Sequence, residues 1–232
     1  MTEVSPLELT SVYATLANKG IYNEPYSILK IEDKDGIIID QYFSHSQEAI
    51  SEETAFLMTS MLESVVNEGS GIRTRVIHKF YRPAAGKTGT TQDYGDAWFM
   101  GFTPQIAAGV WVGFDDRRVS FTGAYGQGAK AANPIWSNFM RETYDSLDLP
   151  LKTFEIPANG NIVSVKFCKE SIYQLGDPRL YSNDCSSGEI TDYINLKDIP
   201  VTYDRKRDIY AKVFTQYMKQ DSLAHEAIEI LE

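Results

Sequence analysis

The sequence predicts an α+β fold in which helices flank an antiparallel sheet. Three runs typical of strands follow one another closely, at residues 84–91, 97–103 and 106–114. Connections this short join only antiparallel neighbours, because a parallel pair needs a crossover of about a dozen residues or more. Two helical patterns precede these runs and one follows them, and each needs a partner layer to bury its apolar face.

The first helix is predicted from its start signal. Ser5-Pro6-Leu7-Glu8 fits a capping box, in which Ser5 is the N-cap, Pro6 takes the first helical position and Glu8 reaches back to the cap. Gly20 can end the helix. Between these signals, apolar residues recur at helical spacing, at Leu9, Val12, Tyr13 and Leu16.

Turn and cap residues define the next elements. Residues 26–32 and 37–43 flank a turn at 33–36 and predict a hairpin. A second helix is predicted from Ser51 to about Asn67, with acidic residues in the first turn, where the helix dipole favours them.

A third helix is predicted after the sheet, at residues 134–144. Large aromatic side chains of the sheet and of this helix are expected to form a core and not a ligand platform: Trp98, Phe99, Trp111, Phe114, Trp136 and Phe139. Asp93 and Asp96 are interpreted as turn residues, and Asp96 is a candidate for positioning the strand before it.

Composition excludes several classes of function. The formal net charge of −10 argues against a nucleic-acid surface, which needs a basic stripe to displace counterions. No run approaches the roughly 18 apolar residues of a membrane helix, and the first ten residues do not read as a signal peptide. Cys168 and Cys185 form no CxxC or Cys/His cluster, so a structural zinc site is not expected. The residues alone leave open whether these two thiols are free or paired.

Lys87 stands out because it lies between glycines in a run that otherwise predicts a buried strand. A phosphate-binding loop of the form G-x-x-x-x-G-K-[ST] would need glycine at position 81, which is Tyr81, and a helix after the lysine. The residues that follow Lys87 are poor helix formers, so this interpretation fails. Without further context, an ordinary lysine on a strand edge would be the simpler interpretation.

The motifs around Lys87 supply that context. "GKTGTT", followed by "DAWFMGFTP", "GVWVGFDD" and "AANPIWSNFM", resembles the end of the transpeptidase domain of class A (bifunctional) penicillin-binding proteins. "SPLELTSVYATLANKG", "PYSILKIEDKDG" and "ISEETAFLMTSMLESVVNEGSGI" are similar to the elements that precede the Lys-Thr-Gly strand in that family. The resemblance covers residues 5–140 and is weaker beyond them. It implies a partial penicillin-binding-protein/serine β-lactamase-like fold.

The resemblance also implies a chemistry. The family forms an acyl-enzyme on a serine from stem peptides ending in D-alanyl-D-alanine, and β-lactams mimic this donor. Lys87 would supply a cation for the donor carboxylate, and the hydroxyls of Thr88 and Thr90 would bind it. Gly89 would let the substrate lie close along the strand edge, and the Thr90 N–H would be an oxyanion-hole donor. No metal or organic cofactor is implied.

Two family motifs do not appear as the chemistry requires. S-x-N is absent, and S-x-x-K occurs once, at Ser27 to Lys30, where a strand-like run would point the two side chains to opposite faces. We therefore expect residues 1–150 to be the C-terminal portion of a transpeptidase domain, with residues 151–232 as a tail or small satellite segment. The nucleophile, a glycosyltransferase domain and a membrane anchor would lie in a missing N-terminal part. A helix is predicted from Asp208 onward.

Three functions remain as alternatives: a fragment of a peptidoglycan D,D-transpeptidase, an acyl-serine hydrolase (carboxypeptidase or β-lactamase), and a non-catalytic binding module. The transpeptidase interpretation places the domain at the extracytoplasmic face of a bacterial membrane, with stem peptides and β-lactams as partners. Disulfides persist in that location, so the resemblance favours a bond between Cys168 and Cys185.

Overall fold

The computed structural model describes residues 4–116, 118–209 and 212. The chain divides into two compact units, Met1–Pro157 and Ala158–Glu232. The boundary expected after residue 150 falls a little before this division. The described residues contain no helix with the length and apolar character needed to cross a membrane.

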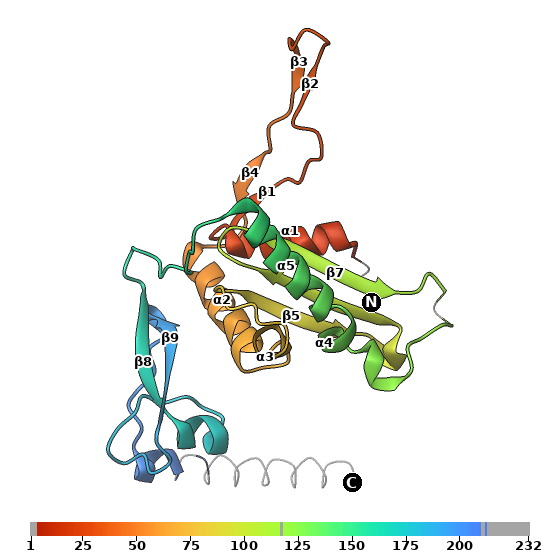
Figure 1. Ribbon diagram of the computed structural model, residues 1–232. Helices are drawn as coiled ribbons and strands as arrows, with labels where there is room; N and C mark the ends of the chain where they lie inside the picture. Colours follow the sequence, from red (N-terminus) through yellow and green to blue (C-terminus); the bar gives the residue numbers. More distant parts are fainter. Residues whose placement is uncertain (1–3, 117, 210–211, 213–232) are drawn as a thin grey trace, which may run out of the picture. The chain divides into compact units, whose positions relative to one another are not determined.

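The first unit contains the helices and the sheet that the sequence predicts (Figure 1). Ser5 and Glu8 form the predicted capping box, and the hydrogen bond from the Ser5 backbone lowers the pKa of Glu8. Ser51 caps the second helix. The helices are α1 (Pro6–Ala17), α2 (Glu52–Asn67), α3 (Arg73–Val76), α4 (Gly128–Ala131) and α5 (Asn133–Leu147), with 3-10 turns η1 (Gln92–Tyr94) and η2 (Gly123–Gly126).

The central sheet has three antiparallel strands in the order β5-β6-β7. They are β5 (Ala85–Thr90), β6 (Asp96–Phe102) and β7 (Ala107–Gly113). In the register, Lys87 pairs with Met100, which in turn pairs with Gly109. Lys87 therefore lies on an edge strand, as predicted.

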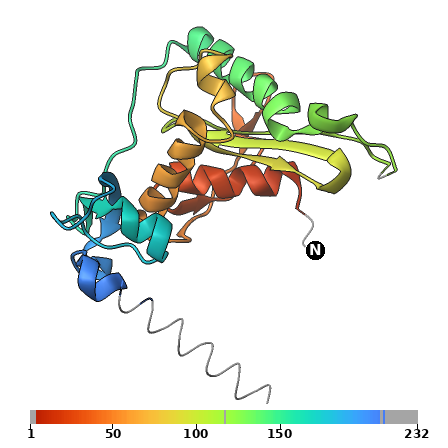
Figure 2. The ribbon, with the colours of Figure 1, turned by 90° about the horizontal axis from the view of Figure 1, so that it is seen from below.

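Helices cover both faces of this sheet (Figure 2). On one face, the α5 residue Trp136 is fully buried against Phe99 and donates to the carbonyl of Ala108 at 3.1 Å. On the other face, Tyr13 of α1 packs edge-on against Phe102. The sheet and α5 thus form the core, as the aromatic pattern predicts.

Part of the predicted aromatic core is exposed. Phe99 and Trp136 are buried, but Phe139 lies on the outer side of α5 and is 52% exposed. Trp111 lies on β7, the other edge strand of the sheet, and Phe114 follows that strand; each is 38% exposed. A hydrophobic residue can lie in a correctly predicted helix or strand and still face solvent. The spacing of apolar residues in the sequence does not distinguish such a residue from a buried one.

The predicted hairpin forms β2 (Lys30–Glu32) and β3 (Ile38–Gln41), which are shorter than expected and extend away from the sheet (Figure 1). At its base, β1 (Ile21–Asn23) pairs with β4 (Ser46–Glu48). Ser27 lies in a bend between β1 and β2 and not in a helix. The helical geometry that would bring a serine and a lysine three residues apart together is therefore absent at this match.

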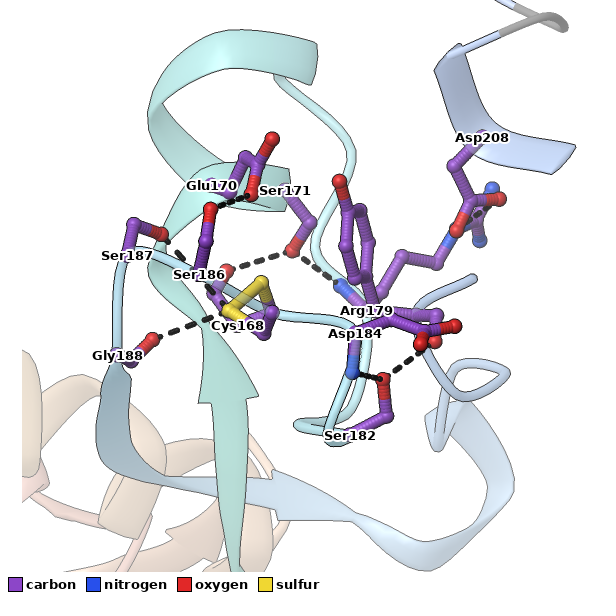
Figure 3. The surroundings of a disulfide bond; sticks show 12 residues. Cys168, Glu170, Ser171, Arg179, Ser182, Asp184, Ser186, Ser187, Gly188 and Asp208 are labelled. Carbon is purple, nitrogen blue, oxygen red and sulfur yellow. Dashed lines mark hydrogen bonds and ion pairs between the residues drawn. A yellow bond between two sulfur atoms is a disulfide. The ribbon is translucent and has the colours of Figure 1, made fainter. Parts of the chain in front are cut away.

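The second unit is built on a hairpin of β8 (Ile162–Cys168) and β9 (Glu189–Asn195). Cys168 and Cys185 form a disulfide, as the resemblance predicts (Figure 3). Both are buried against Tyr203. Between the two cysteines lies the π-helical segment η3 (Ser171–Leu175), and a 3-10 turn η4 (Leu196–Asp198) follows β9.

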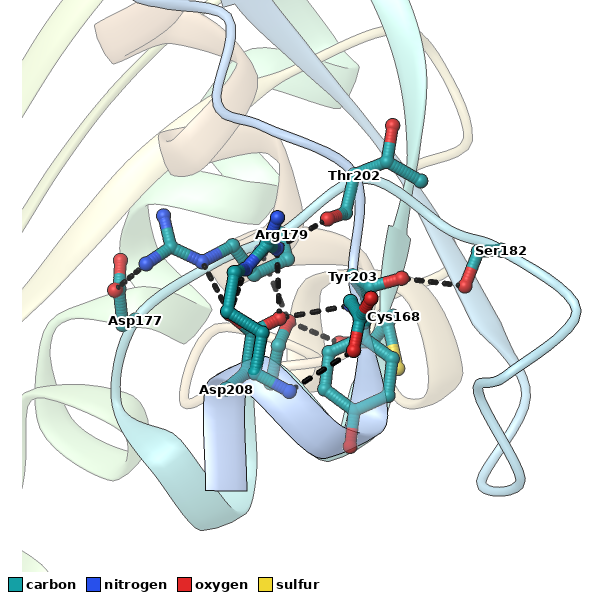
Figure 4. Close-up of polar contacts among 10 residues, drawn as sticks. Cys168, Asp177, Arg179, Ser182, Thr202, Tyr203 and Asp208 are labelled. Atoms are coloured by element: carbon teal, nitrogen blue, oxygen red, sulfur yellow. Dashed lines mark hydrogen bonds and ion pairs between the residues drawn. The ribbon is translucent and has the colours of Figure 1, made fainter. Parts of the chain in front are cut away.

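Charged residues complete this unit around Asp208 (Figure 4). The carboxylate of Asp208 accepts from Arg207 Nε at 2.9 Å and from the backbone N–H of Asp204 at 2.9 Å, and Arg179 Nε lies 3.8 Å away. Burial alone would raise the pKa of Asp208, but the hydrogen bond from Arg207 and the other contacts outweigh it, so this pKa is lowered. The helix predicted from Asp208 onward falls mostly outside the described residues.

Candidate functional site

The candidate site is the edge strand β5. Gly86 leaves room for the neighbouring strand, since a Cβ at this position would lie 2.8 Å from the Met100 carbonyl oxygen. A Cβ on Gly89 would lie 3.0 Å from that of Trp98. Lys87 is exposed between these two glycines, whereas Ala85 and Gly86 are buried. The backbone of the strand is thus packed tightly while its one cation stays accessible.

The four predicted residues lie on two faces of the strand. Lys87 and Gly89 share a face with Met100 and Trp98, their cross-strand partners, whereas Thr88 and Thr90 lie on the opposite face. The ammonium group of Lys87 donates to the Thr88 carbonyl oxygen at 2.7 Å. This bond brings the cation next to Thr88 although the two side chains start on opposite faces.

Each threonine hydroxyl has one partner from a different segment. Thr88 Oγ1 lies 2.7 Å from Ser70 Oγ, and either hydroxyl can donate. Thr90 Oγ1 accepts from the backbone N–H of Gly128 at 3.1 Å, which leaves the Thr90 hydrogen available for a ligand. Gly128 approaches so closely that a Cβ there would lie 2.4 Å from the Gly89 carbonyl oxygen. Only glycine fits at this position without movement of the strand.

Asp96 fixes the end of the strand. Its backbone N–H donates to Thr91 Oγ1 at 2.8 Å, and its carboxylate accepts from Trp111 Nε1 at 2.9 Å and from Thr91 Oγ1 at 3.2 Å. One side chain therefore links β6 with β7 and with the residue that follows β5. This agrees with the positioning role considered for Asp96 from the sequence.

Arg75 holds the segment that leads into β5. Its guanidinium donates to the carbonyl oxygens of Phe80 at 2.6 Å and Arg82 at 2.7 Å, and its Nε donates to Asn67 Oδ1 at 2.9 Å. Burial lowers the pKa of Arg75 and the nearby charge of Glu63 opposes this effect. An arginine side chain stays charged even when its pKa is lowered by burial. The segment that precedes β5 is therefore held by hydrogen bonds from a permanently charged guanidinium.

Sequence reasoning located the strand but not the residues around it. Ser70, Arg75 and Gly128 come from segments for which the sequence predicted no helix or strand. The one sequence signal near Ser70 is the pair of glycines on either side of it, which indicates a tight turn. Those glycines do not show which residues the turn contacts.

Comparisons with known proteins identify what this arrangement is similar to. Residues 2–141 match the family model of the penicillin-binding protein transpeptidase domain. Penicillin-binding protein 1A of Aquifex aeolicus is 36% identical over 163 residues, which are 70% of this chain and 22% of that protein. Penicillin-binding protein 1F of Bacillus subtilis is 39% identical over 118 residues, covering 48% of this chain and 16% of that protein.

A solved structure gives the same result for the fold. The crystal structure of penicillin-binding protein 1A from Haemophilus influenzae aligns with a TM-score of 0.75 and 25% identity. The alignment covers 87% of this chain and 33% of the solved chain. The present chain thus spans only a minor part of the length of these proteins, and the predicted fold class is confirmed.

Proposed function

Because the chain belongs to the penicillin-binding protein transpeptidase family, we propose that it carries the donor-binding strand of a peptidoglycan D,D-transpeptidase. In this proposal Lys87, Thr88, Gly89 and Thr90 bind the D-alanyl-D-alanine end of a stem peptide, or a β-lactam in its place. The site lies outside the cytoplasm of a bacterium. The buried disulfide of the second unit is compatible with that location.

One observation carries the proposal: Lys87 is exposed on the edge strand β5 and its ammonium bonds to the backbone carbonyl oxygen of Thr88, while the opposite face of the same strand carries the hydroxyls of Thr88 and Thr90. A carboxylate is the ligand that such a set of donors fits, because charge-assisted hydrogen bonds are about twice as strong as neutral ones. The open edge of β5 can accept an extended peptide as an additional strand, and Gly89 presents no side chain to it. The Lys87 cation and the threonine hydroxyls suit the carboxylate, and the strand edge suits the backbone, of a peptide that ends in a carboxylate.

The reaction is acyl transfer through a seryl ester. A serine oxygen attacks the penultimate D-alanine carbonyl carbon, the peptide C–N bond breaks, and the terminal D-alanine leaves with a proton. An amine of a second stem peptide then attacks the ester and regenerates the serine. In this chain, Lys87 and the two threonines hold the donor carboxylate, and the Thr90 N–H is the proposed donor to the oxyanion, an interaction worth roughly 100- to 1000-fold in rate.

The serine and its lysine base are proposed to come from residues outside these 232. The single S-x-x-K match places Ser27 in a bend, where the motif lacks helical geometry. The chain by itself would then be a binding module without a nucleophile, which is the second candidate function. Both candidates share the carboxylate site and differ in whether a serine ester can form.

Labelling with a fluorescent penicillin distinguishes the transpeptidase fragment from the binding module. We expect no covalent adduct on this chain, as judged by denaturing gel and intact mass. A chimera in which residues 2–141 replace the matching segment of the Aquifex aeolicus relative should form one. In that chimera Lys87→Ala should slow acylation about tenfold or more, because a hydrogen bond to a charged group contributes about 1.5–3 kcal/mol. Lys87→Arg should restore the rate only in part, since the guanidinium differs in shape.

The matched control is Lys34→Ala, which removes an exposed lysine from the β2–β3 turn. It should leave acylation unchanged. A stoichiometric adduct on any serine of the chain alone would refute the assignment of the nucleophile to other residues. Normal acylation of the Lys87→Ala chimera would refute the carboxylate site.

A further inference from the structure

Ser70 is the feature of the site that the proposed function does not yet use. It lies in the turn after α2, between Gly69 and Gly71, and its hydroxyl contacts Thr88 Oγ1 across a sequence distance of 18 residues. No other hydrogen bond of the Ser70 hydroxyl occurs among the described residues. Its one side-chain interaction is therefore with a residue of the candidate carboxylate site.

The turn holds Ser70 in place without that contact. The backbone N–H of Gly69 donates to the Ser64 carbonyl oxygen at 2.9 Å, and that of Gly71 donates to the Val65 carbonyl oxygen at 2.9 Å. Gly69 is needed for this close approach, since a Cβ there would lie 2.8 Å from the Val65 Cα, and a Cβ on Gly71 would lie 3.1 Å from the Val65 carbonyl oxygen. The position of the Ser70 hydroxyl is thus set by the end of α2 before any contact with β5 is made.

A count of hydroxyl hydrogens shows what the contact does. Ser70 and Thr88 together have two hydroxyl hydrogens, and one of them occupies the bond between their oxygens. The other remains free to donate to a ligand. The ammonium of Lys87 bonds to the backbone carbonyl oxygen of Thr88, the residue whose hydroxyl Ser70 contacts.

We propose that Ser70 is a positioning residue of the carboxylate site: its hydroxyl bonds to that of Thr88, so that the remaining hydrogen of the pair is directed at the anion bound by Lys87. This inference rests on the proposed function. Without Ser70, the Thr88 hydroxyl would exchange its hydrogen bonds with water and rotate freely, and its orientation would have to be fixed by the ligand itself.

The test is a titration of the isotope-labelled full chain, followed through the backbone amide signals of residues 87–90. Two probes are compared, acetyl-D-alanyl-D-alanine and its C-terminal amide, which lacks the negative charge. We expect the wild type to prefer the carboxylate. Ser70→Ala should reduce this preference by about five- to tenfold, less than the loss of a direct hydrogen bond to a charge. Ser70→Thr retains the hydroxyl and should keep the preference within about twofold.

Ser64→Ala is the matched control, because Ser64 is exposed near the end of the same helix and its hydroxyl, among the residues that the structure describes, bonds only to the Ser60 carbonyl oxygen at 3.4 Å. It should have no effect. Equal weakening of both probes by Ser70→Ala would show a merely structural role and overturn the proposal. Loss of preference in Lys87→Ala but not in Ser70→Ala would overturn the role of Ser70 alone. If the wild type shows no preference for the carboxylate probe, the carboxylate site is overturned, and the role of Ser70 with it. The same holds if the Lys87→Ala variant keeps the wild-type preference.

Discussion

The two compact units are stabilised by different means. In the first unit, Trp136, Phe99 and Met140 are fully or almost fully buried between the sheet and α5, and all three tryptophans of the chain lie in this unit. In the second unit, the buried cluster consists of the disulfide and Tyr203. A smaller unit buries a smaller share of its surface, so covalent links replace part of the apolar core.

Buried charge follows the same division. The second unit buries Asp208 and Glu170, and each has a partner: Asp208 accepts from Arg207, and Glu170 Oε2 accepts from Ser186 Oγ at 3.0 Å. Burial, followed by the charge of Glu170, raises the pKa of Tyr203. In the first unit the buried polar residues are neutral, as in the bond from Asn133 Nδ2 to Thr74 Oγ1 at 2.7 Å. The second unit should therefore respond to reductant where the first does not, and its buried carboxylates should make it sensitive to pH.

The largest expected effect is on the apolar core of the first unit. Trp136→Ala removes the central side chain and should cost about 3–5 kcal/mol in the free energy of unfolding. Denaturant titrations followed by the fluorescence of Trp98 and Trp111 measure this. Phe139→Ala, on the exposed side of the same helix, is the control and should cost far less. Similar losses for the two variants would contradict the assignment of the core.

Loss of the disulfide should affect the second unit alone. Reduction, or replacement of both cysteines by alanine, should cost about 3 kcal/mol in the chain-entropy model for a loop of 17 residues. Hydrogen exchange should accelerate in β8 and β9 while the tryptophan fluorescence of the first unit stays unchanged. Unaltered exchange in the hairpin would mean that the disulfide is not needed for its stability.

Protonation of Asp208 should destabilise the second unit. The pKa of Asp208 is lowered in the folded state. Its contribution is therefore complete above the unfolded-state pKa of about 3.9 and is lost as the pH falls through the lower folded-state value. Asp208→Asn removes charge-assisted bonds worth about 2 kcal/mol and should abolish this pH dependence. Hydrogen exchange of the hairpin against pH measures it.

The exposed Asp184 provides the control for that experiment, and Asp184→Asn should leave both stability and its pH profile unchanged. A pH profile that survives in Asp208→Asn would assign the effect to another group.

The smallest expected change in stability is at the candidate site. Lys87→Ala removes an exposed side chain that donates only to the carbonyl oxygen of the next residue, so the free energy of unfolding should change by no more than about 0.5 kcal/mol. Thermal melting tests this alongside the ligand titration. A large drop in melting temperature with normal ligand binding would make Lys87 a structural residue.

The sequence by itself determined the elements and the strand that carries the site. The capping box at Ser5, the N-cap at Ser51 and the three short-linked strands are local signals, and each is present in the structure. Lys87 was identified through motifs in its own and adjacent segments. The strands β1, β4 and β9 were not predicted.

Only the tertiary structure decided which residues surround Lys87 and which aromatic side chains are buried. Ser70 and Gly128 meet β5 through close approaches of segments 18 and 38 residues away, and no periodicity encodes the partner of a turn. The same limit applies to Phe139 and Trp111, whose exposure depends on where α5 sits and on β7 being a sheet edge. Local patterns specify the conformation of a segment, whereas contacts depend on the packing of segments far apart in the chain, which is why the site residues were found only in part.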